Sequence, residues 1–293
     1  MAPGWRSTLK VGIHLPQYGP NVQGQPIRAA DVSEAARFAE AEGFSSVWVS
    51  DHVAVDADGA DPFSIIHDAT VVLSIAGAAT RSVFLGFSVL VVPYRVVPLM
   101  AKLLTSLDIL MDGRAIAGIG IGNRPLESMA LQASWESRGH VTDERLSLLR
   151  RMLDGERIEL RELGAEDGVD KYVGVAPTGS RRIPIWVGGM SSAALKRAST
   201  FGDGWHASFS PCGSEERYSP DRIRPMVEWL RTIRPDRTFV VSMRANREAQ
   251  PVRGAAGRAF LESAAACLDE LVFSPRPWPG DLRSWRHEVE IRA

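Results

Sequence analysis

Short apolar runs and longer stretches of helical periodicity alternate along the chain. The apolar runs show little alternation with polar residues, which is typical of strands buried on both faces of a parallel sheet. Between them, apolar residues recur at intervals of three or four, as in Val32, Ala35, Ala36 and Ala39, which favours helices with one buried face. The pattern therefore predicts a fold in which strands and helices alternate.

Eight strands are predicted, over residues 9–16, 44–50, 83–92, 115–122, 183–188, 203–210, 238–245 and 268–274. Helices are expected in the segments that join them, with Asp61 and Thr142 as N-caps of two of these helices. The charged, glycine-punctuated segment 155–182 breaks the alternation. We interpret it as an excursion from the repeated pattern, with a hairpin as the expected form.

Eight strand–helix units predict an α/β fold, a single (β/α)8 TIM barrel that occupies residues 1–293 as one domain with a small excursion around 155–182. A doubly wound open sheet is the alternative. The first connection carries no GxGxxG fingerprint, which would anchor a dinucleotide in such a sheet. The barrel is therefore preferred, and it places function at the carboxyl ends of the strands.

The composition excludes some classes of protein. The formal net charge is −1, from 34 basic and 35 acidic side chains, so no surplus of positive charge favours binding to nucleic acid. Cys212 and Cys267 have no zinc-like spacing. We find no apolar core of a signal peptide and no apolar run of the roughly 20 residues that cross a membrane. We therefore expect a soluble, cytoplasmic protein with no membrane or nucleic-acid partner.

Titratable side chains follow the first two predicted strands. Asp51 and His52 end the second strand, and His14 ends the first. A histidine titrates near neutral pH and acts as acid or base, so His52 is a candidate for proton transfer. The alternative is a helix-capping Asp51 beside a surface His52. A packed core histidine is the alternative for His14.

The third and fourth strands carry unusual small residues. Ser88 carries the hydroxyl group of an otherwise apolar strand. It is either a core serine bonded to the backbone or part of a bulge that faces a ligand. Gly118, Gly120 and Gly122 alternate and make room either for a neighbouring layer or for a flat ligand. Asn123 and Glu127 follow at the barrel mouth, and Tyr94 follows the third strand.

Gly188 and Gly189 follow the fifth strand, and Ser191 opens the next helix. A glycine turn at a helix N-terminus directs backbone N–H groups at one point, which favours a phosphate. A tight turn with a serine N-cap explains the same residues. The local sequence leaves both interpretations open.

Six segments in order resemble the bacterial luciferase-like superfamily of flavin and deazaflavin oxidoreductases. They are "GIHLPQYG", "GFSSVWVSDH", "LGFSVLVVPYRVVPLMAK…LDILMDGR", "GIGIGNRPLE", "RGHVTDERLSLLRRML" and "PIWVGGMSSAALKRASTFGDGW". The resemblance covers nearly the whole chain and implies a TIM barrel. "FSVLVVPYR" and "WVGGMSSAALKRA" look most like the branch that uses coenzyme F420.

The resemblance implies that F420, or FMN as the alternative, binds at the carboxyl face of the barrel. The residues that match cofactor-binding positions are Asp51, Ser88, Val89, Gly122, Asn123, Gly188, Gly189 and Met190. In the F420 branch the pair matching Ser88 and Val89 forms a bulge with a cis peptide. Many members carry Trp or Glu where this chain has Asn123, which leaves His52 as the proton donor, with Asp51 orienting it and Glu127 behind it.

The leading hypothesis is an F420-dependent oxidoreductase that transfers a hydride between the deazaflavin and a C=C, C=N or C=O group of a small-molecule or peptide substrate. His14, Tyr94 and Trp135 are the candidate substrate-binding residues. An FMN-dependent monooxygenase and a non-catalytic ligand-binding barrel are the alternatives. A metal-dependent barrel hydrolase would carry an HxH pair on its first strand. This chain lacks that pair, so no metal is expected. The apolar second and third helices favour a homodimer.

Overall fold

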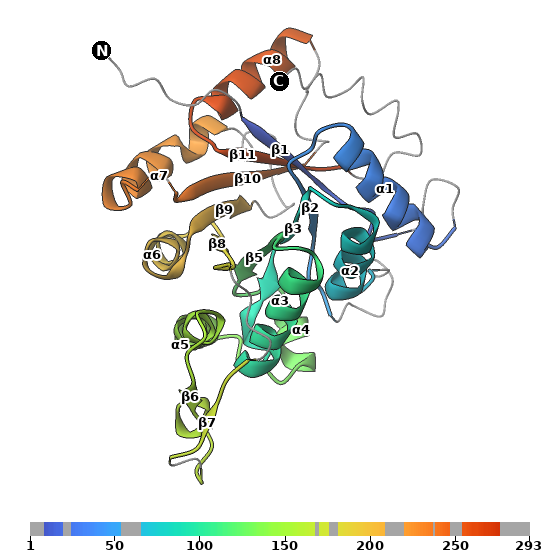
Figure 1. Cartoon of the computed structure of the whole chain (residues 1–293). Helices are drawn as coiled ribbons and strands as arrows, with labels where there is room; N and C mark the ends of the chain where they lie inside the picture. The colour runs from blue at the N-terminus through green and yellow to red at the C-terminus, as the bar shows by residue number, and fades with distance from the viewer. Residues whose placement is uncertain are drawn as a thin grey trace.

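Eight parallel strands close into a barrel within the part of the chain that the computed structural model describes, which is residues 9–19, 25–53, 66–167, 170–175, 181–208, 220–236, 238–246 and 254–275. The strands are β1 (Lys10–His14), β2 (Ser46–Val49), β3 (Phe84–Phe87), β5 (Ala115–Gly120), β8 (Ile185–Gly188), β9 (Gly204–Ser208), β10 (Val240–Asn246) and β11 (Glu270–Ser274). Each strand pairs in parallel with the next, and β1 pairs with β11 to close the ring (Figure 1). The predicted (β/α)8 barrel is confirmed.

Helices surround the strands, as Figure 1 shows. They are α1 (Ala29–Ala41), α2 (Ala69–Ala79), α3 (Val97–Leu110), α4 (Pro125–Ala130), α5 (Arg138–Leu153), α6 (Ser192–Phe201), α7 (Pro220–Ile233) and α8 (Gly254–Ala265). The predicted hairpin is confirmed, because β6 (Ile158–Glu159) and β7 (Tyr172–Val173) pair antiparallel and extend away from the barrel. A 3-10 turn, η2 (Leu160–Leu163), follows β6.

Two helix starts differ from the prediction. The second helix begins at Ala69, where Asp68 caps it by accepting hydrogen bonds from the amides of Thr70 and Val71; Asp61 lies outside the described residues. Thr142 is not an N-cap but lies inside α5, where its hydroxyl donates to the carbonyl of Arg138 at 2.7 Å. The prediction missed the first turn of α5 because that turn is polar and shows no apolar period.

The third predicted strand is interrupted. β3 ends at Phe87, the Ser88–Val89 peptide is cis, and the short strand β4 (Leu90–Val91) then pairs with β5 before a 3-10 turn, η1 (Val92–Tyr94). Ser88 therefore marks a break in the strand, as the bulge interpretation predicts.

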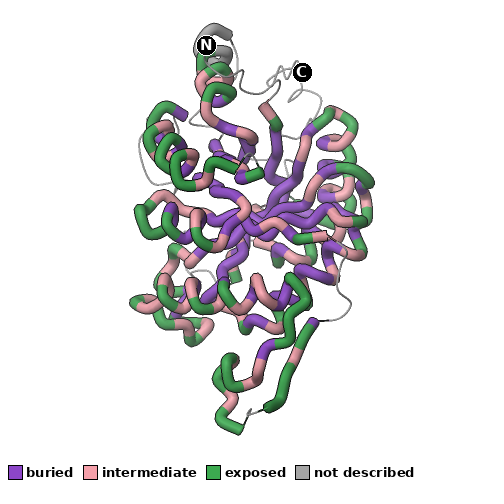
Figure 2. Tube along the Cα trace, turned by 60° about the vertical axis from the view of Figure 1, so that its left-hand side comes forward, coloured by how far each residue is buried: buried purple, intermediate pink, exposed green. Residues whose placement is uncertain are grey.

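The core is organised in two shells, and Figure 2 shows the buried residues concentrated in the central strands. One shell packs the helices against the outside of the strands. The other fills the barrel interior with Trp48, Ile116, Trp186 and Val272. An added Cβ at Gly12 would lie 2.7 Å from Nε1 of Trp48, so this glycine makes room for the large indole.

Glu270 is a buried carboxyl at the start of β11. Its Oε1 accepts hydrogen bonds from the hydroxyls of Ser46 (2.6 Å) and Ser45 (2.8 Å), whereas its Oε2 has no hydrogen-bond partner among the described residues. Burial raises the pKa of Glu270 above its usual value, and the two hydroxyls and the charge of Lys10 oppose only part of this effect.

Replacing Glu270 by Gln is expected to raise stability at alkaline pH and to change it little in acid. Because the folded-state pKa is raised, the carboxyl favours folding only while it is protonated, and that contribution is lost as the pH rises through the folded pKa. The neutral amide of the variant side chain mimics the protonated acid at every pH. Urea unfolding of both proteins between pH 5 and pH 9 measures their free energies of unfolding. If the difference between the two proteins did not change with pH over this range, the raised pKa of Glu270 would be contradicted.

Candidate functional site

The sequence-predicted site residues lie at one end of the barrel. Asp51 and His52 follow β2, Ser88 and Val89 follow β3, and the glycine turn at Gly188 ends β8. All eight strands are parallel, so their carboxyl ends share one rim of the barrel (Figure 1). The fold therefore brings together residues that are more than 130 positions apart in the chain.

His52 pairs with Glu127. Its Nδ1 lies 3.3 Å from Oε2 of Glu127, and Oε1 of Glu127 accepts the amide of Val53 at 2.7 Å. Glu127 is 1% exposed and comes from α4, whereas the His52 side chain keeps 14% exposure. A histidine that donates Nδ1–H to a buried carboxylate leaves Nε2 to accept or donate a proton.

Asp51 has a partner that the sequence did not predict, because its carboxylate is bound to Arg95. Its Oδ2 and Oδ1 accept from the two terminal guanidinium nitrogens of Arg95 at 2.5 Å and 2.7 Å, and Oδ2 also accepts the amide of Val91 at 2.8 Å. Burial raises the pKa of Asp51, and the positive charge of Arg95 opposes the rise. Asp51 therefore anchors the segment after β3 to the end of β2.

The alternating glycines make room for a neighbouring layer. An added Cβ at Gly188 would lie 2.7 Å from Cγ1 of Val89, and one at Gly120 would overlap the same side chain. At Gly118 the carbonyl oxygen of Phe87 occupies that space. The neighbouring-layer interpretation is therefore confirmed for Gly118 and Gly120, and the Val89 side chain links the break after β3 to the turn after β8.

The turn at Gly189 is a tight one with a serine N-cap. Gly189 has φ +106°, a conformation that favours glycine, and its carbonyl accepts from Nε1 of Trp205 at 2.8 Å. Ser191 caps α6 by accepting the amide of Ala194. The first turn of any helix carries amides without intrahelical partners, so this geometry also suits a phosphate. Met190 packs beside this turn against the core.

The remaining candidates lie at or after the strand ends, except Trp135, which lies between α4 and α5. Gly122 has φ +80° next to the phenol of Tyr94, whose oxygen lies 3.4 Å from the hydroxyl of Ser128. Trp135 stacks on the guanidinium of Arg138, 3.6 Å from its ring centroid. Asn123 is exposed, and His14 is buried at the end of β1.

Sequence reasoning missed two interior residues, His206 on β9 and Arg244 on β10. Burial, and then the charge of Arg244, lowers the pKa of His206 to about 3, so the imidazole is neutral. The sequence did contain a signal for them. Side chains alternate between the two faces of a strand, and His206 and Arg244 lie at the positions of their apolar strands that face the barrel interior.

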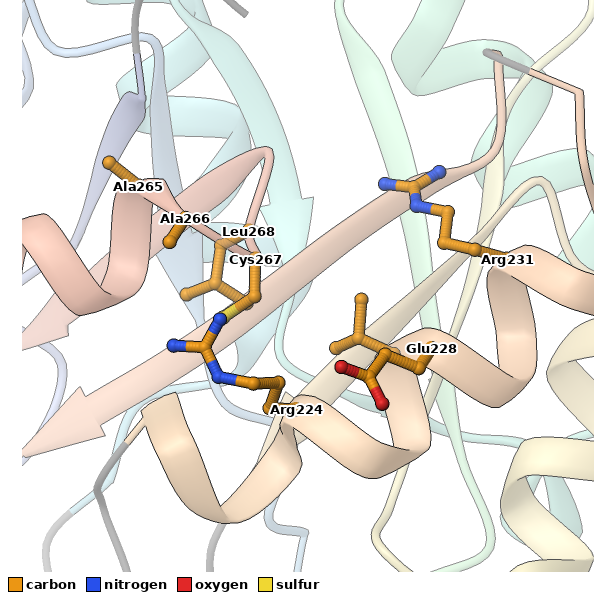
Figure 3. A pocket seen from close by; sticks show the side chains of 8 residues that line it. Arg224, Glu228, Arg231, Ala265, Ala266, Cys267 and Leu268 are labelled. Atoms are coloured by element: carbon orange, nitrogen blue, oxygen red, sulfur yellow. The ribbon is translucent and has the colours of Figure 1, made fainter. Parts of the chain in front are cut away.

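A pocket on the outer surface lies between α7 and the residues that precede β11 (Figure 3). It is lined by Arg224, Val227, Glu228, Arg231, Ala265, Ala266, Cys267 and Leu268. The two arginines there form ion pairs, Arg224 with Asp221 and Arg231 with Asp269. Burial raises the pKa of the Cys267 thiol, so it is not activated. Because residues 265–268 lead into the amino end of β11, this pocket lies apart from the barrel mouth.

Among the described residues, no group of three or more His, Cys, Asp or Glu side chains is placed to hold a metal ion. No helix in the described part of the chain has both the length and the apolar character to cross a membrane.

Comparisons with known proteins agree with this geometry. A family model for luciferase-like monooxygenases matches residues 9–228. The F420-dependent hydroxymycolic acid dehydrogenase of Mycobacterium tuberculosis is 31% identical over 178 residues, which is 59% of this chain and 47% of that protein. The F420-dependent glucose-6-phosphate dehydrogenase of Nakamurella multipartita is 27% identical over 195 residues, 64% of this chain and 55% of that protein. The matches therefore span about half the length of these curated relatives.

One solved structure, an F420-dependent secondary alcohol dehydrogenase in complex with an F420–acetone adduct, superposes with a TM-score of 0.67. The superposition covers 92% of this chain and 94% of that one at 16% sequence identity. At this identity the likeness shows a shared barrel fold.

Proposed function

The chain belongs to the luciferase-like monooxygenase family, and from this premise we propose that it is an F420-dependent oxidoreductase. The similarity to two dehydrogenases named for their dependence on F420 carries the proposal. The substrate is a small organic molecule or a peptide. In the reducing direction its C=C, C=N or C=O group accepts a hydride. In the oxidising direction the corresponding saturated group donates one. The pairing of His52 with Glu127 at the barrel mouth supports this chemistry.

The residues at the mouth fit such a cofactor. The turn at Gly188, Gly189 and Met190, at the start of α6, offers backbone N–H groups to a phosphate. Ser88, Val89, Gly122 and Asn123 follow the neighbouring strands β3 and β5, next to this turn, and are proposed to border the ring. Asp51 contributes indirectly, because it holds Arg95 and the Val91 amide next to Val89.

When bound, the deazaflavin supplies the hydride. The protein orients the reactants and provides one proton. His52 holds that proton at Nε2, and the Glu127 carboxylate fixes the imidazole through Nδ1. In the oxidising direction the same nitrogen accepts the proton. His14, Tyr94 and Trp135 are proposed to border the substrate.

Titration of the protein with oxidised F420 and with FMN tests the proposal, with binding followed by fluorescence. We expect binding of F420 and transfer of hydride from reduced F420 to at least one acceptor of the classes named above. Tight FMN binding with oxygen uptake in the presence of a flavin reductant would favour the monooxygenase instead. Binding of neither cofactor would favour a non-catalytic barrel.

Replacing Gly188 by Ala is expected to raise the Kd for F420 by at least about tenfold, because the new Cβ displaces Val89 and the adjoining turn. Gly174, in the hairpin, is the matched control, because an added Cβ there lies 3.8 Å from its nearest neighbour. Gly174→Ala should bind F420 like the wild type. Equal affinities of the two variants would contradict the role of Gly188, and circular dichroism shows whether both are folded.

A homodimer is also proposed. Val71 of α2 and Leu99 and Leu110 of α3 are large apolar side chains that are more than half exposed. Association of these helices would cover them. Sedimentation equilibrium is expected to give twice the mass of the 293-residue chain, and Leu99→Arg is expected to shift the protein towards the monomer.

A further inference from the structure

Arg244 of β10 connects several strand ends inside the barrel mouth. Its Nη1 donates to the carbonyl oxygen of Ser88 and to the hydroxyl of Ser50, both at 3.1 Å. Its Nη2 donates to the hydroxyls of Ser274 (3.0 Å) and Tyr18 (3.3 Å). One guanidinium therefore joins the ends of β2, β3 and β11 and the loop after β1.

Ser88 is held at both of its oxygen atoms. Besides Arg244, the hydroxyl of Ser50 donates to the Ser88 carbonyl at a longer 3.4 Å. The Ser88 hydroxyl lies 2.8 Å from Nε2 of His206, whose Nδ1 lies 3.0 Å from the hydroxyl of Ser242. Of these contacts, the bond from Arg244 is the charge-assisted one and the stronger restraint on the carbonyl.

His206 is a neutral support for this arrangement. Its imidazole stacks on Trp48 with 4.8 Å between ring centroids and 6° between planes, and it is completely buried. Because its pKa is lowered to about 3, it adds no positive charge beside Arg244. The positive charge next to the Ser88 carbonyl is therefore supplied by the Arg244 guanidinium and not by His206.

We propose that Arg244 is a positioning residue that holds the Ser88 carbonyl, and through it the Ser88–Val89 segment, in the conformation that receives the cofactor ring. This inference rests on the proposed function for the identity of the ring. Four of the guanidinium N–H groups are used by protein oxygens, and one of these is the Ser88 carbonyl through which Arg244 is proposed to act. The planar guanidinium of Arg244 donates to four acceptors at once. The ammonium of Lys is a compact group with three donors, so it cannot replace all four bonds.

The test uses Arg244→Ala and Arg244→Lys in the full chain, with Kd for oxidised F420 measured by fluorescence. We expect Arg244→Ala to raise Kd at least tenfold and Arg244→Lys to restore only part of the affinity. Guanidinium ion at millimolar, non-denaturing concentration is expected to restore binding to Arg244→Ala. Wild-type affinity in Arg244→Ala would overturn the proposal.

Arg231→Ala is the matched control. Arg231 also joins a backbone carbonyl and a polar side chain, because it donates to the Phe239 carbonyl and to the Asp269 carboxylate, but it lies on the outer side of the barrel. We expect it to lower stability without changing Kd, and without rescue by guanidinium. An equal rise of Kd in both variants would mean that Arg244 is merely structural. If Arg244→Ala does not fold, Arg244→Gln takes its place in the same comparison.

Hydrogen exchange of the cofactor-free protein separates this inference from the proposed function. Peptides covering residues 86–92 are expected to exchange faster in Arg244→Ala than in the wild type, and at the wild-type rate in Arg231→Ala. Unchanged exchange would refute the restraint on Ser88 whichever cofactor binds. Faster exchange in a protein that binds no F420 would support the restraint while the proposed function fails.

Discussion

Replacing His52 by Ala is expected to reduce turnover with F420 by about 10²–10⁴-fold, the usual contribution of a positioned general acid or base. The loss is expected because, in the proposed mechanism, Nε2 of His52 holds the transferred proton, while Nδ1 contacts the Glu127 carboxylate. The Kd for F420 should change less than about twofold, since the phosphate contacts are proposed for the Gly189 turn and not for His52. Stopped-flow oxidation of reduced F420 measures the rate, and fluorescence titration measures the affinity.

His140→Ala serves as the control for this experiment. His140 is exposed on α5, where it faces Glu144 one turn along the helix, so it shares the His–Glu pairing but not the location. This variant should retain wild-type turnover. Equal turnover of His52→Ala and the wild type would exclude His52 as the proton donor. Glu127→Gln should lower turnover by a smaller factor, because the imidazole remains but its orienting carboxylate is lost.

Replacing Asp51 by Asn is expected to lower the free energy of unfolding by about 3 kcal/mol, towards the lower end of the range for breaking a buried ion pair. The substitution leaves the guanidinium of Arg95, which is 18% exposed, without its carboxylate partner. Urea unfolding, followed by circular dichroism, measures the change. Removing the charge as well, in Asp51→Asn with Arg95→Met, should recover part of the loss, because no unpaired cation remains.

Asp221→Asn is the control for the ion pair. Asp221 also binds an arginine, Arg224, but both side chains are substantially exposed, so solvent already screens the pair. The control should unfold at the same urea concentration as the wild type. A loss of turnover in Asp51→Asn without a loss of stability would instead restore Asp51 to the role first expected for it, that of orienting His52.

Much of the fold could be predicted because its signals are local. Buried strands such as β5 (Ala115–Gly120) are continuous apolar runs, and the helices carry their apolar residues at a regular spacing. The position of the site could be predicted for the same reason, since the end of an apolar run is visible in the sequence. Boundaries were less accurate at α2 and α5, where capping and a polar first turn decide the start.

The sequence by itself determined the order of the elements, the closed barrel that follows from it, and the set of residues at the strand ends. Only the tertiary structure decided which of these residues act together. Glu127 lies 75 positions from His52, and Arg244 lies 156 positions from Ser88. Such partners meet because a parallel barrel brings distant strand ends to one rim, and because side-chain direction there depends on register and packing. Asp51 and His52 are adjacent in the chain, yet the structure gives them different acidic or basic partners, Arg95 for Asp51 and Glu127 for His52.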